Sequence, residues 1–439
     1  MHRTSTLTLA GLVCLALLGS TRHADGVAPD DPPRPNILVI VGDDVGWGDL
    51  DPVVPTPNIA ALASQGVTFR RAYAMPYCSP TRFSLLFGMQ AFREGLGTYI
   101  DPNDLDDISV SRSELALPRV LRDNGYATLA AGKWHLSTFA IGVPDAYEWP
   151  RQFGFQHFLA GRIGNLGQTV TYTNWPRIDD GVRTDTTEYN TTAVRRAASQ
   201  WWEQTTGPKF AYVAFHAPHA PFHVPPSTLL PPGQAVGSDD RSKYEAMVMA
   251  LDAEIGKLLA KVDLENTLVI FVSDNGTPTN ACARGQDTGK AKGSVFEGGI
   301  HVPLIVAGWG AARGRTTEAL VSVTDLFATI LELTQIPRPV GHAIDSVSFA
   351  RQLYVPELRG RDWVYSQTFA PNGFGPKDHN ARAVVTKRYK LMADERGERL
   401  FDLEHDPDET HPLPLRGGNA WIRDRLRGFM SSMASQGAP

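Results

Sequence analysis

Apolar runs bounded by polar turns alternate with helix-like patterns along most of the chain. Residues 36–41 read Asn-Ile-Leu-Val-Ile-Val, and such an unbroken apolar run is typical of a strand buried on both faces of a sheet. The rhythm predicts an α/β fold in which helices cover both faces of a parallel or mixed sheet. The other predicted strands are 126–131, 210–215, 268–272 and 302–307, and the predicted helices include 119–124, 186–203, 239–262 and 325–333.

One further helix has recognisable start and stop signals. Thr56 can cap its first turn, and Pro57 suits the first helical position because a proline there loses no helical hydrogen bond. Gly66 is expected to end the helix as a terminal glycine. Two long stretches rich in Pro, Gly and polar residues, 140–183 and 221–238, are predicted to be loops that line a binding site.

The pattern changes after about residue 355. Short strands are predicted over 364–367, 383–391 and 399–403, followed by an amphipathic helix over 420–432. These elements predict a small antiparallel sheet plus a helix, packed on the main domain. We therefore expect a main domain over residues 34–355 and a C-terminal subdomain over residues 356–435.

The N-terminus is typical of an export signal. His2 and Arg3 precede an apolar run over 7–18 that is too short to span a bilayer. The small residues Ala24 and Gly26 mark a cleavage site, which predicts a signal peptide over residues 1–26. The mature protein is then expected in the periplasm or outside the cell; the alternative is an uncleaved membrane anchor.

The overall charge limits the classes of partner. The 439 residues carry a formal net charge of −5, which argues against nucleic acid as the main partner. Attraction for an anionic substrate must then come from a local cluster of bases. Of the three cysteines, Cys14 lies in the predicted signal, and Cys78 and Cys282 could form a disulfide in an exported protein. We do not expect that disulfide, because Cys78 lies in a motif, described below, that predicts a different role for it.

Two acidic pairs follow predicted strands. Asp43 and Asp44 come directly after the strand at 36–41, and Asp274 and Asn275 follow the strand at 268–272. Sites in open α/β sheets form at the carboxyl ends of strands, so these oxygens are expected at one edge. An all-oxygen set suits a hard cation such as Ca²⁺ or Mg²⁺. Each pair taken alone is equally well explained as a solvated turn.

Basic residues come from three further segments near the same edge. Lys133 and His135 follow the strand at 126–131, His216 and His219 follow the strand at 210–215, and Lys292 precedes the strand at 302–307. A surface lysine is normally solvated, and a histidine after a strand is more often structural than catalytic. Taken together, these cations would bind and polarise a tetrahedral oxyanion.

The segment Cys78-Ser79-Pro80-Thr81-Arg82 resembles the Cys-x-Pro-x-Arg signature of the sulfatases. The resemblance extends over roughly residues 34 to 410 and includes, in the family's order, the acidic pairs, the block at 132–135, Pro218-His219-Ala220-Pro221 and the block at 292–299. It implies a fold similar to alkaline phosphatase, an α/β architecture with a large mixed, mostly parallel sheet flanked by helices and a small C-terminal antiparallel subdomain.

The resemblance also implies a chemistry. Cys78 would be oxidised to formylglycine by a formylglycine-generating enzyme, since a plain thiolate is a poor partner for a hard cation. Arg82 would ion-pair with the modified group, Lys133 and Lys292 would hold sulfate oxygens, His135 would act as a base and His219 would protonate the leaving oxygen. Ca²⁺, rather than Mg²⁺, would be bound by Asp43, Asp44, Asp274, Asn275 and modified Cys78.

These expectations together describe a hydrolase of sulfate monoesters, acting on an aryl sulfate or a sulfated carbohydrate. The nearest alternative is a phosphomonoester or phosphonate ester hydrolase of the same superfamily, although Asn275 favours the sulfatase, because related phosphonate hydrolases tend to carry a histidine there. A second alternative is a non-catalytic protein that binds sulfated glycans, which would keep the basic cluster but need no oxidised cysteine.

Overall fold

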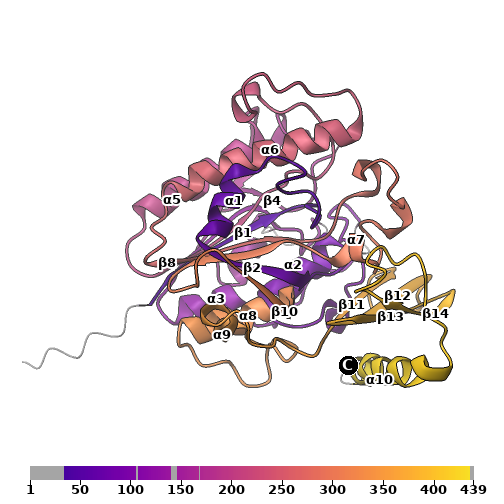
Figure 1. The fold of residues 1–439 in the computed structure, drawn as a ribbon. Coiled ribbons are helices and arrows are strands. Elements are labelled where there is room, and N and C mark those ends of the chain that lie inside the picture. The colour runs from indigo at the N-terminus through magenta and orange to yellow at the C-terminus, as the bar shows by residue number, and fades with distance from the viewer. Residues whose placement is uncertain (1–33, 105–106, 140–145, 168, 436–439) are drawn as a thin grey trace, which may run out of the picture. The chain divides into compact units, whose positions relative to one another are not determined.

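Two sheets form the framework of the chain. The computed structural model describes residues 34–104, 107–139, 146–167 and 169–435, and the predicted signal peptide over 1–26 lies outside them. The larger sheet has ten strands in the order β10-β2-β9-β8-β1-β7-β3-β4-β5-β6, and the smaller has four in the order β11-β12-β13-β14 (Figure 1). The predicted α/β class, with a mixed, mostly parallel sheet and a small antiparallel sheet near the C-terminus, is confirmed.

The centre of the large sheet is parallel. Strand β1 pairs with β7 on one side and β8 on the other, and β3 pairs with the far side of β7. The side chains of Ile37, Val39 and Val41 enter one core, while Leu38 and Ile40 enter the core on the opposite face. The bounds of these strands are β1 Asn36–Gly42, β3 Ala127–Lys133, β7 Lys209–Ala214 and β8 Thr267–Ser273.

Helices cover both faces of this sheet, as predicted. The core on the Val39 face includes side chains of α2, α3 and α8, and the core on the Leu38 face includes side chains of α1, α5 and α6. Each buried aliphatic side chain contributes about 1.5–3 kcal/mol to folding. The helices are α1 Pro57–Ser64, α2 Cys78–Phe87, α3 Leu117–Asp123, α4 Trp149–Gln152, α5 Asn190–Gln204, α6 Asp240–Leu259, α7 Glu297–Ile300, α8 Leu326–Leu333, α9 Ala350–Tyr354 and α10 Ala420–Ser435.

The prediction for Gly66 was wrong. Gly66 does not end α1 but begins strand β2 (Gly66–Tyr73), which pairs antiparallel with β9 (Leu304–Gly308). A Cβ atom at this position would lie 2.2 Å from the carbonyl oxygen of Val306, so glycine is needed for the close approach of the two strands. Thr56 does not cap α1 with its side chain; its hydroxyl accepts a hydrogen bond from the Asp51 amide instead.

The predicted loop over 140–183 was also wrong in part. It contains strands β4 (His157–Arg162) and β5 (Trp175–Asp179) and the start of β6 (Val182–Thr186). Strand β4 extends the large sheet by parallel pairing with β3, and β5 and β6 are added by antiparallel pairing. Helix α5 consequently begins at Asn190 rather than at residue 186, because residue 186 is paired in β6. Residues 140–145 and 168 lie outside the described part of the chain. Strand β10 (Arg315–Ser322), at the opposite edge, was not predicted.

The small sheet packs on both of its faces. One face shares a core with Tyr73, Ile300 and Leu320 of the main domain, and the other is covered by α10. The strand predicted over 383–391 is in fact two strands, because the chain turns at Lys387 and Arg388. The strands are β11 Trp363–Ala370, β12 His379–Thr386, β13 Tyr389–Asp394 and β14 Gly397–Asp402. Among the described helices, none is long and apolar enough to cross a bilayer.

Candidate active site

The ends of β1 and β8 bring four oxygen-bearing side chains together. Because the two strands are parallel and Gly42 pairs with Ser273, the residues that follow them lie opposite each other. The Asp44 amide donates a hydrogen bond to Oδ1 of Asp274 over 3.2 Å. Nδ2 of Asn275 donates to Oδ1 of Asp44 over 2.6 Å. These side chains and that of Asp43 are buried.

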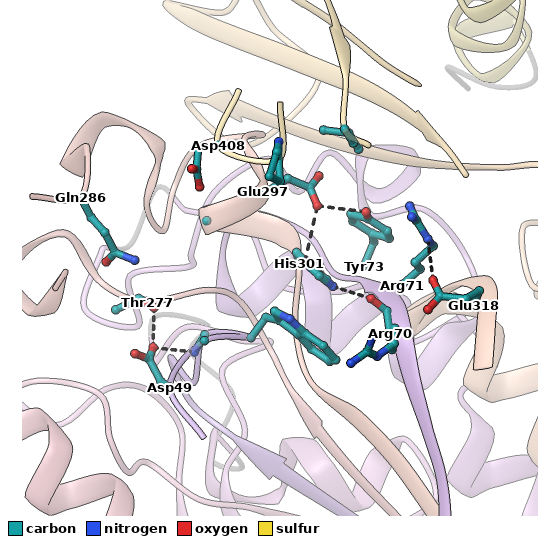
Figure 2. A pocket seen from close by; sticks show the side chains of 16 residues that line it. Asp49, Arg70, Arg71, Tyr73, Thr277, Gln286, Glu297, His301, Glu318 and Asp408 are labelled. Carbon is teal, nitrogen blue, oxygen red and sulfur yellow. Dashed lines mark hydrogen bonds and ion pairs between the residues drawn. The ribbon is translucent and has the colours of Figure 1, made fainter. Parts of the chain in front are cut away.

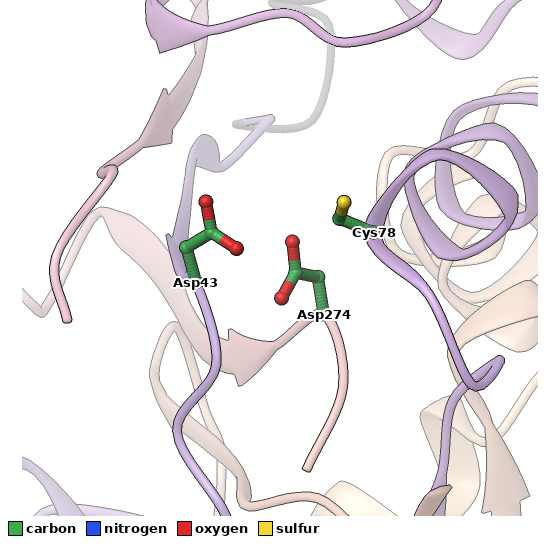
Figure 3. A group of neighbouring side chains, drawn as sticks. All are labelled: Asp43, Cys78 and Asp274. Atoms are coloured by element: carbon green, nitrogen blue, oxygen red, sulfur yellow. The ribbon is translucent and has the colours of Figure 1, made fainter. Parts of the chain in front are cut away.

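Cys78 faces this group from the first turn of α2. A sulfur or carboxylate oxygen from each of Asp43, Cys78 and Asp274 lies within 4.8 Å of the others (Figure 3). The side chain of Cys78 is buried, and burial raises the pKa of its thiol. An unmodified Cys78 would therefore be a neutral thiol, which is neither a good nucleophile nor a ligand for a hard cation.

The oxygens at this edge fit a hard cation. Oδ1 of Asp43 and Oδ1 of Asn275 are buried and have no hydrogen-bond partner. A buried acceptor without a partner costs about 1–3 kcal/mol, a cost that a bound cation would remove. Burial and the neighbouring Asp43 also raise the pKa of Asp274, a repulsion that positive charge would relieve. The donor set contains only carboxylate and amide oxygens, which suits Ca²⁺.

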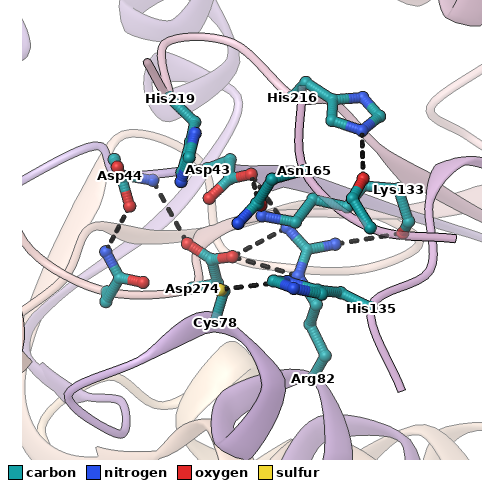
Figure 4. A network of polar contacts seen from close by, with 12 residues as sticks. Asp43, Asp44, Cys78, Arg82, Lys133, His135, Asn165, His216, His219 and Asp274 are labelled. Carbon is teal, nitrogen blue, oxygen red and sulfur yellow. Dashed lines mark hydrogen bonds and ion pairs between the residues drawn. The ribbon is translucent and has the colours of Figure 1, made fainter. Parts of the chain in front are cut away.

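Each carboxylate is also paired with a basic side chain, and Figure 4 shows the pairs made by Asp43 and Asp274. Nζ of Lys133, at the end of β3, lies 2.5 Å from Oδ2 of Asp43. The ammonium of Lys292 contacts Oδ1 of Asp44. Burial alone would raise the pKa values of Asp43 and Asp44, but these two lysines lower both below the ordinary value. Both aspartates are therefore ionised at neutral pH, which a cation ligand requires.

Arg82 is held mainly by Asp274. Its Nη2 and Nε atoms lie 2.7 and 3.0 Å from Oδ2 of Asp274, and Nη1 donates to the carbonyl oxygen of Lys133 over 3.1 Å. Its other described polar contacts go to the hydroxyl of Tyr212, over 3.5 Å, and to Oδ2 of Asp43, at 3.7 Å, and no described hydrogen bond goes to Cys78. The guanidinium orients the carboxylate beside Cys78 and brings positive charge into the site.

His135 touches Cys78 directly. Its Nδ1 lies 3.1 Å from Sγ of Cys78, and its Nε2 lies 2.9 Å from the carbonyl oxygen of Ile100. Since a carbonyl can only accept, Nε2 carries the proton and the lone pair of Nδ1 faces position 78. Burial and the nearby Lys133 lower the pKa of His135, so the ring is neutral and able to accept a proton.

His219 lies on the opposite side of the group, next to the aspartates. A ring nitrogen of His219 and one oxygen each from Asp43 and Asp44 lie within 4.8 Å of one another. Its Nδ1 donates to the carbonyl oxygen of Ala220 over 2.7 Å, so Nε2 is the atom left for proton transfer. Burial lowers the pKa of His219, while the two aspartates act in the opposite direction.

His216 has a different environment from His219. Its Nε2 lies 3.2 Å from the carbonyl oxygen of Gly164, and its Nδ1 is buried without a partner. The neighbouring Asn165 was missed in the sequence analysis. Figure 4 places it beside Lys133, and its Oδ1 is also buried without a partner. Its sequence signal was no more than a polar residue in a predicted loop.

The structure also has a hollow that lies apart from these residues. It has a volume of about 620 Å³, and Trp47, Asp49, Arg70, Glu297 and His301 are among the side chains that line it (Figure 2). None of the ten predicted site residues lines it. Two aromatic rings of this hollow stack on the ring of His301. The centroid of Trp47 lies 4.7 Å from that of His301, and the centroid of Tyr73 lies 5.3 Å from it. The candidate site residues thus lie outside this hollow.

Comparison with known families and proteins finds sulfatases. The profile of a family described as Sulfatase matches residues 35–336, and one described as N-sulphoglucosamine sulphohydrolase, C-terminal, matches residues 290–436. N-acetylgalactosamine-6-sulfatase of the dog, Canis lupus familiaris, is 31% identical over 374 residues, which cover 76% of this chain and 69% of the relative. Arylsulfatase A of cattle, Bos taurus, is 30% identical over 447 residues, which cover 89% of this chain and 85% of the relative.

The fold is similar to solved structures over nearly its whole length. The crystal structure of Ps i-CgsB superposes with a TM-score of 0.79 at 25% sequence identity, and the match covers 91% of this chain and 92% of that one. The similarity therefore includes both the large sheet and the small C-terminal sheet.

Proposed function

The chain belongs to the sulfatase family, and from this premise we propose that it hydrolyses sulfate monoesters at Cys78, oxidised to formylglycine, with the help of a bound Ca²⁺. The observation that carries the proposal is the placement of Cys78 between His135 and the carboxylates of Asp43 and Asp274. No such arrangement is needed by a protein that only binds sulfated glycans.

Two groups complete this site in the proposal. Ca²⁺ would be held by Asp43, Asp44, Asp274 and Asn275 with modified Cys78, which is supported by the partnerless oxygens of Asp43 and Asn275. When present, the cation supplies positive charge toward the sulfate oxygens, and formylglycine, as its hydrate, supplies an oxygen nucleophile where cysteine has sulfur. Mg²⁺ is the less favoured ion.

The basic side chains would bind the sulfate group. Lys133, Lys292 and Arg82 now neutralise the aspartates, and all three are close enough to Cys78 to interact with it electrostatically. With a cation bound to the aspartates, their positive charge becomes available to the negative oxygens of the substrate. Preorganised charge in a dry site stabilises a transition state more than the same charge in water. We therefore assign these three residues to binding and polarising sulfate.

His135 and His219 would move protons on opposite sides of the sulfur atom of the substrate. Nδ1 of His135 is suited to accept a proton from the group at position 78, because its lone pair faces that position. Nε2 of His219 is suited to protonate the leaving alcohol oxygen. Burial disfavours the protonated form of His219, and the approach of an anionic sulfate favours it. This assignment gives one base and one acid.

The substrate class follows from the relatives. One relative is by name an N-acetylgalactosamine-6-sulfatase and another an arylsulfatase, so one name refers to a sulfated sugar and the other to an aryl sulfate. We propose a sulfated carbohydrate as the substrate, with aryl sulfates as surrogates. The proposal also requires a formylglycine-generating enzyme as a partner during maturation, and export to the periplasm or beyond as the predicted signal peptide implies.

Sulfate release from 4-nitrophenyl sulfate tests the proposal. The protein is produced together with a formylglycine-generating enzyme, and the peptide containing residue 78 is analysed by mass spectrometry for the aldehyde. We expect activity in the wild type and in Cys282→Ala, which removes the second free thiol of the described residues, and none in Cys78→Ala. Full activity in Cys78→Ala, or faster release of phosphate from 4-nitrophenyl phosphate than of sulfate, would show the proposal to be wrong.

A further inference from the structure

Two tyrosine rings lie between the buried site and solvent. The ring of Tyr99 lies 6.4 Å from that of His135, centroid to centroid, and His135 in turn contacts Cys78. His135 is fully buried, whereas Tyr99 is 46% exposed. Tyr77, the residue before Cys78, packs edge-on against Tyr99 at 6.0 Å. The ring of Tyr99 therefore lies next to His135 and is also exposed at the surface.

Tyr77 is fixed against the loop that carries Lys292. A Cβ atom on Gly293 would lie 2.6 Å from the hydroxyl of Tyr77, so the tyrosine occupies the space that a side chain at Gly293 would need. The Gly293 amide also donates to the carbonyl oxygen of Pro76 over 3.0 Å. Tyr77 thereby supports Tyr99 from one side and adjoins the Lys292 segment on the other.

Asn372 fixes the backbone around Tyr99 from the far end of β11. Its Oδ1 accepts hydrogen bonds from the amides of Gly97 and Thr98, each over 3.0 Å, and its Nδ2 donates to the carbonyl oxygen of Tyr99 over 3.3 Å. Nδ2 also donates to Oδ1 of Asp107 over 3.0 Å. An exposed aromatic residue whose backbone is held in this way loses little conformational freedom when a ligand packs on it.

From this geometry we propose that Tyr99, supported by Tyr77 and positioned by Asn372, is the platform on which the alcohol portion of the substrate packs. The proposal rests on the proposed function, because it takes the sulfate to lie at Cys78. An alcohol attached to a sulfate bound at Cys78 would extend from the buried site toward solvent, where the ring of Tyr99 is exposed. The platform selects alcohols that present a flat apolar face, which both an aryl group and a pyranose ring do. A short linear alcohol presents no such face.

Kinetics with three classes of ester test the platform. The substrates are 4-nitrophenyl sulfate, glucose 6-sulfate and n-butyl sulfate, and the variants are Tyr99→Ala and Tyr99→Phe. Stacking of one ring corresponds to roughly a fivefold to tenfold change in binding. We expect Tyr99→Ala to raise KM by that factor for one or both ring substrates, with kcat nearly unchanged, because ground state and transition state gain equally from the contact.

The controls separate stacking from general damage. Tyr99→Phe keeps the ring and should stay within about twofold of wild type. Tyr354→Ala removes a tyrosine that is 50% exposed, at the end of α9, and should change nothing. Asn372→Ala should reproduce part of the KM increase for ring substrates but not for n-butyl sulfate, whereas general loss of structure would lower kcat for all three. Equal KM values for wild type and Tyr99→Ala, or an equal effect on n-butyl sulfate, would overturn the platform.

A binding measurement keeps this test independent of turnover. Calorimetry on the Cys78→Ser variant measures the affinities for phenyl sulfate and for inorganic sulfate, and their ratio reports the contribution of the ring. We expect the double variant with Tyr99→Ala to have a ratio roughly fivefold to tenfold lower. If no ester is hydrolysed but the ratio still depends on Tyr99, the proposed function fails and the platform stands. An unchanged ratio shows the platform to be wrong, whatever the activity.

Discussion

The ammonium group of Lys390 lies 3.0 Å from Oε1 of Glu297 and 2.8 Å from Oε1 of Glu409. Lys390 belongs to strand β13 of the small sheet and is fully buried, while Glu297 begins helix α7, five residues after Lys292. Oε2 of Glu409 also accepts a hydrogen bond from the Glu297 amide over 2.6 Å. This buried cluster joins the small sheet to the segment that carries one of the candidate sulfate-binding lysines.

Removing the positive charge of Lys390 from this cluster should destabilise the protein. Lys390→Met leaves two carboxylates facing each other with little solvent access, and loss of one partner of a buried ion pair costs about 3–5 kcal/mol. The free energy of unfolding in urea measures the effect. Lys387→Met, which removes an exposed lysine from the turn before the same strand, is the control and should change stability by less than about 0.5 kcal/mol. Similar stabilities for the two variants would contradict the interpretation.

Calcium should raise the thermal stability of the protein. A ligand that binds only the folded state at one hundred times its Kd adds about 2.7 kcal/mol of stability. We expect a higher Tm when Ca²⁺ is added to chelator-treated protein, and a much smaller rise in Asn275→Ala, which removes one of the partnerless oxygens. Glu404→Gln alters another acidic cluster, at a side chain that is 62% exposed, and serves as the control. The cation site would be refuted by an unchanged rise in Asn275→Ala.

His219→Gln should distinguish good from poor leaving groups. If His219 protonates the departing oxygen, its loss should lower kcat for a sugar sulfate by about 10²–10⁴-fold. The effect on 4-nitrophenyl sulfate should be much smaller, because nitrophenolate leaves without a proton. His411→Gln, at a side chain that is 89% exposed, is the control. An equal loss on both substrates would assign His219 to holding the site rather than to proton transfer.

Stability should fall as the pH is lowered from 7.5 to 5.5. Burial lowers the pKa values of five histidines, so these rings stay neutral in the folded state at pH values where the unfolded chain binds protons. A histidine with a lowered pKa in the folded state contributes stability above its unfolded pKa of about 6.5, and this contribution is lost as the pH falls below that value. The five are His135, His216, His219, His223 and His301.

The slope of stability against pH measures this effect. Each proton bound only by the unfolded state changes the slope by about 1.4 kcal/mol per pH unit. Urea unfolding at fixed free Ca²⁺ should give a decline toward pH 5.5 that becomes shallower in His223→Gln, while His411→Gln keeps the wild-type slope. A flat profile would mean that the buried rings take up protons in the folded state.

Local sequence was sufficient for much of the framework and for placing the two acidic pairs at one edge of the sheet. The unbroken apolar runs at 36–41 and 268–272 identified central strands, because strands buried on both faces must be apolar throughout. The residues that follow those strands could then be placed at one edge, since parallel strands present their carboxyl ends on the same side. Asp43 and Asp274 were found by this rule without any knowledge of distant contacts.

Only the tertiary structure decided which groups pair with one another and where the edge strands lie. Gly66 carries the sequence signal of a helix end, yet the approach of β9 makes it the start of a strand. The pairing of Arg82 with the modified group at position 78 stays a prediction, and only the tertiary structure shows that its guanidinium also contacts Asp274, the residue after β8. Asn372 lies more than 270 residues from Tyr99, and nothing near either residue in the sequence indicates that they meet. Such contacts depend on the relative position of whole elements, which is set by the packing of two cores and not by the pattern of any one segment.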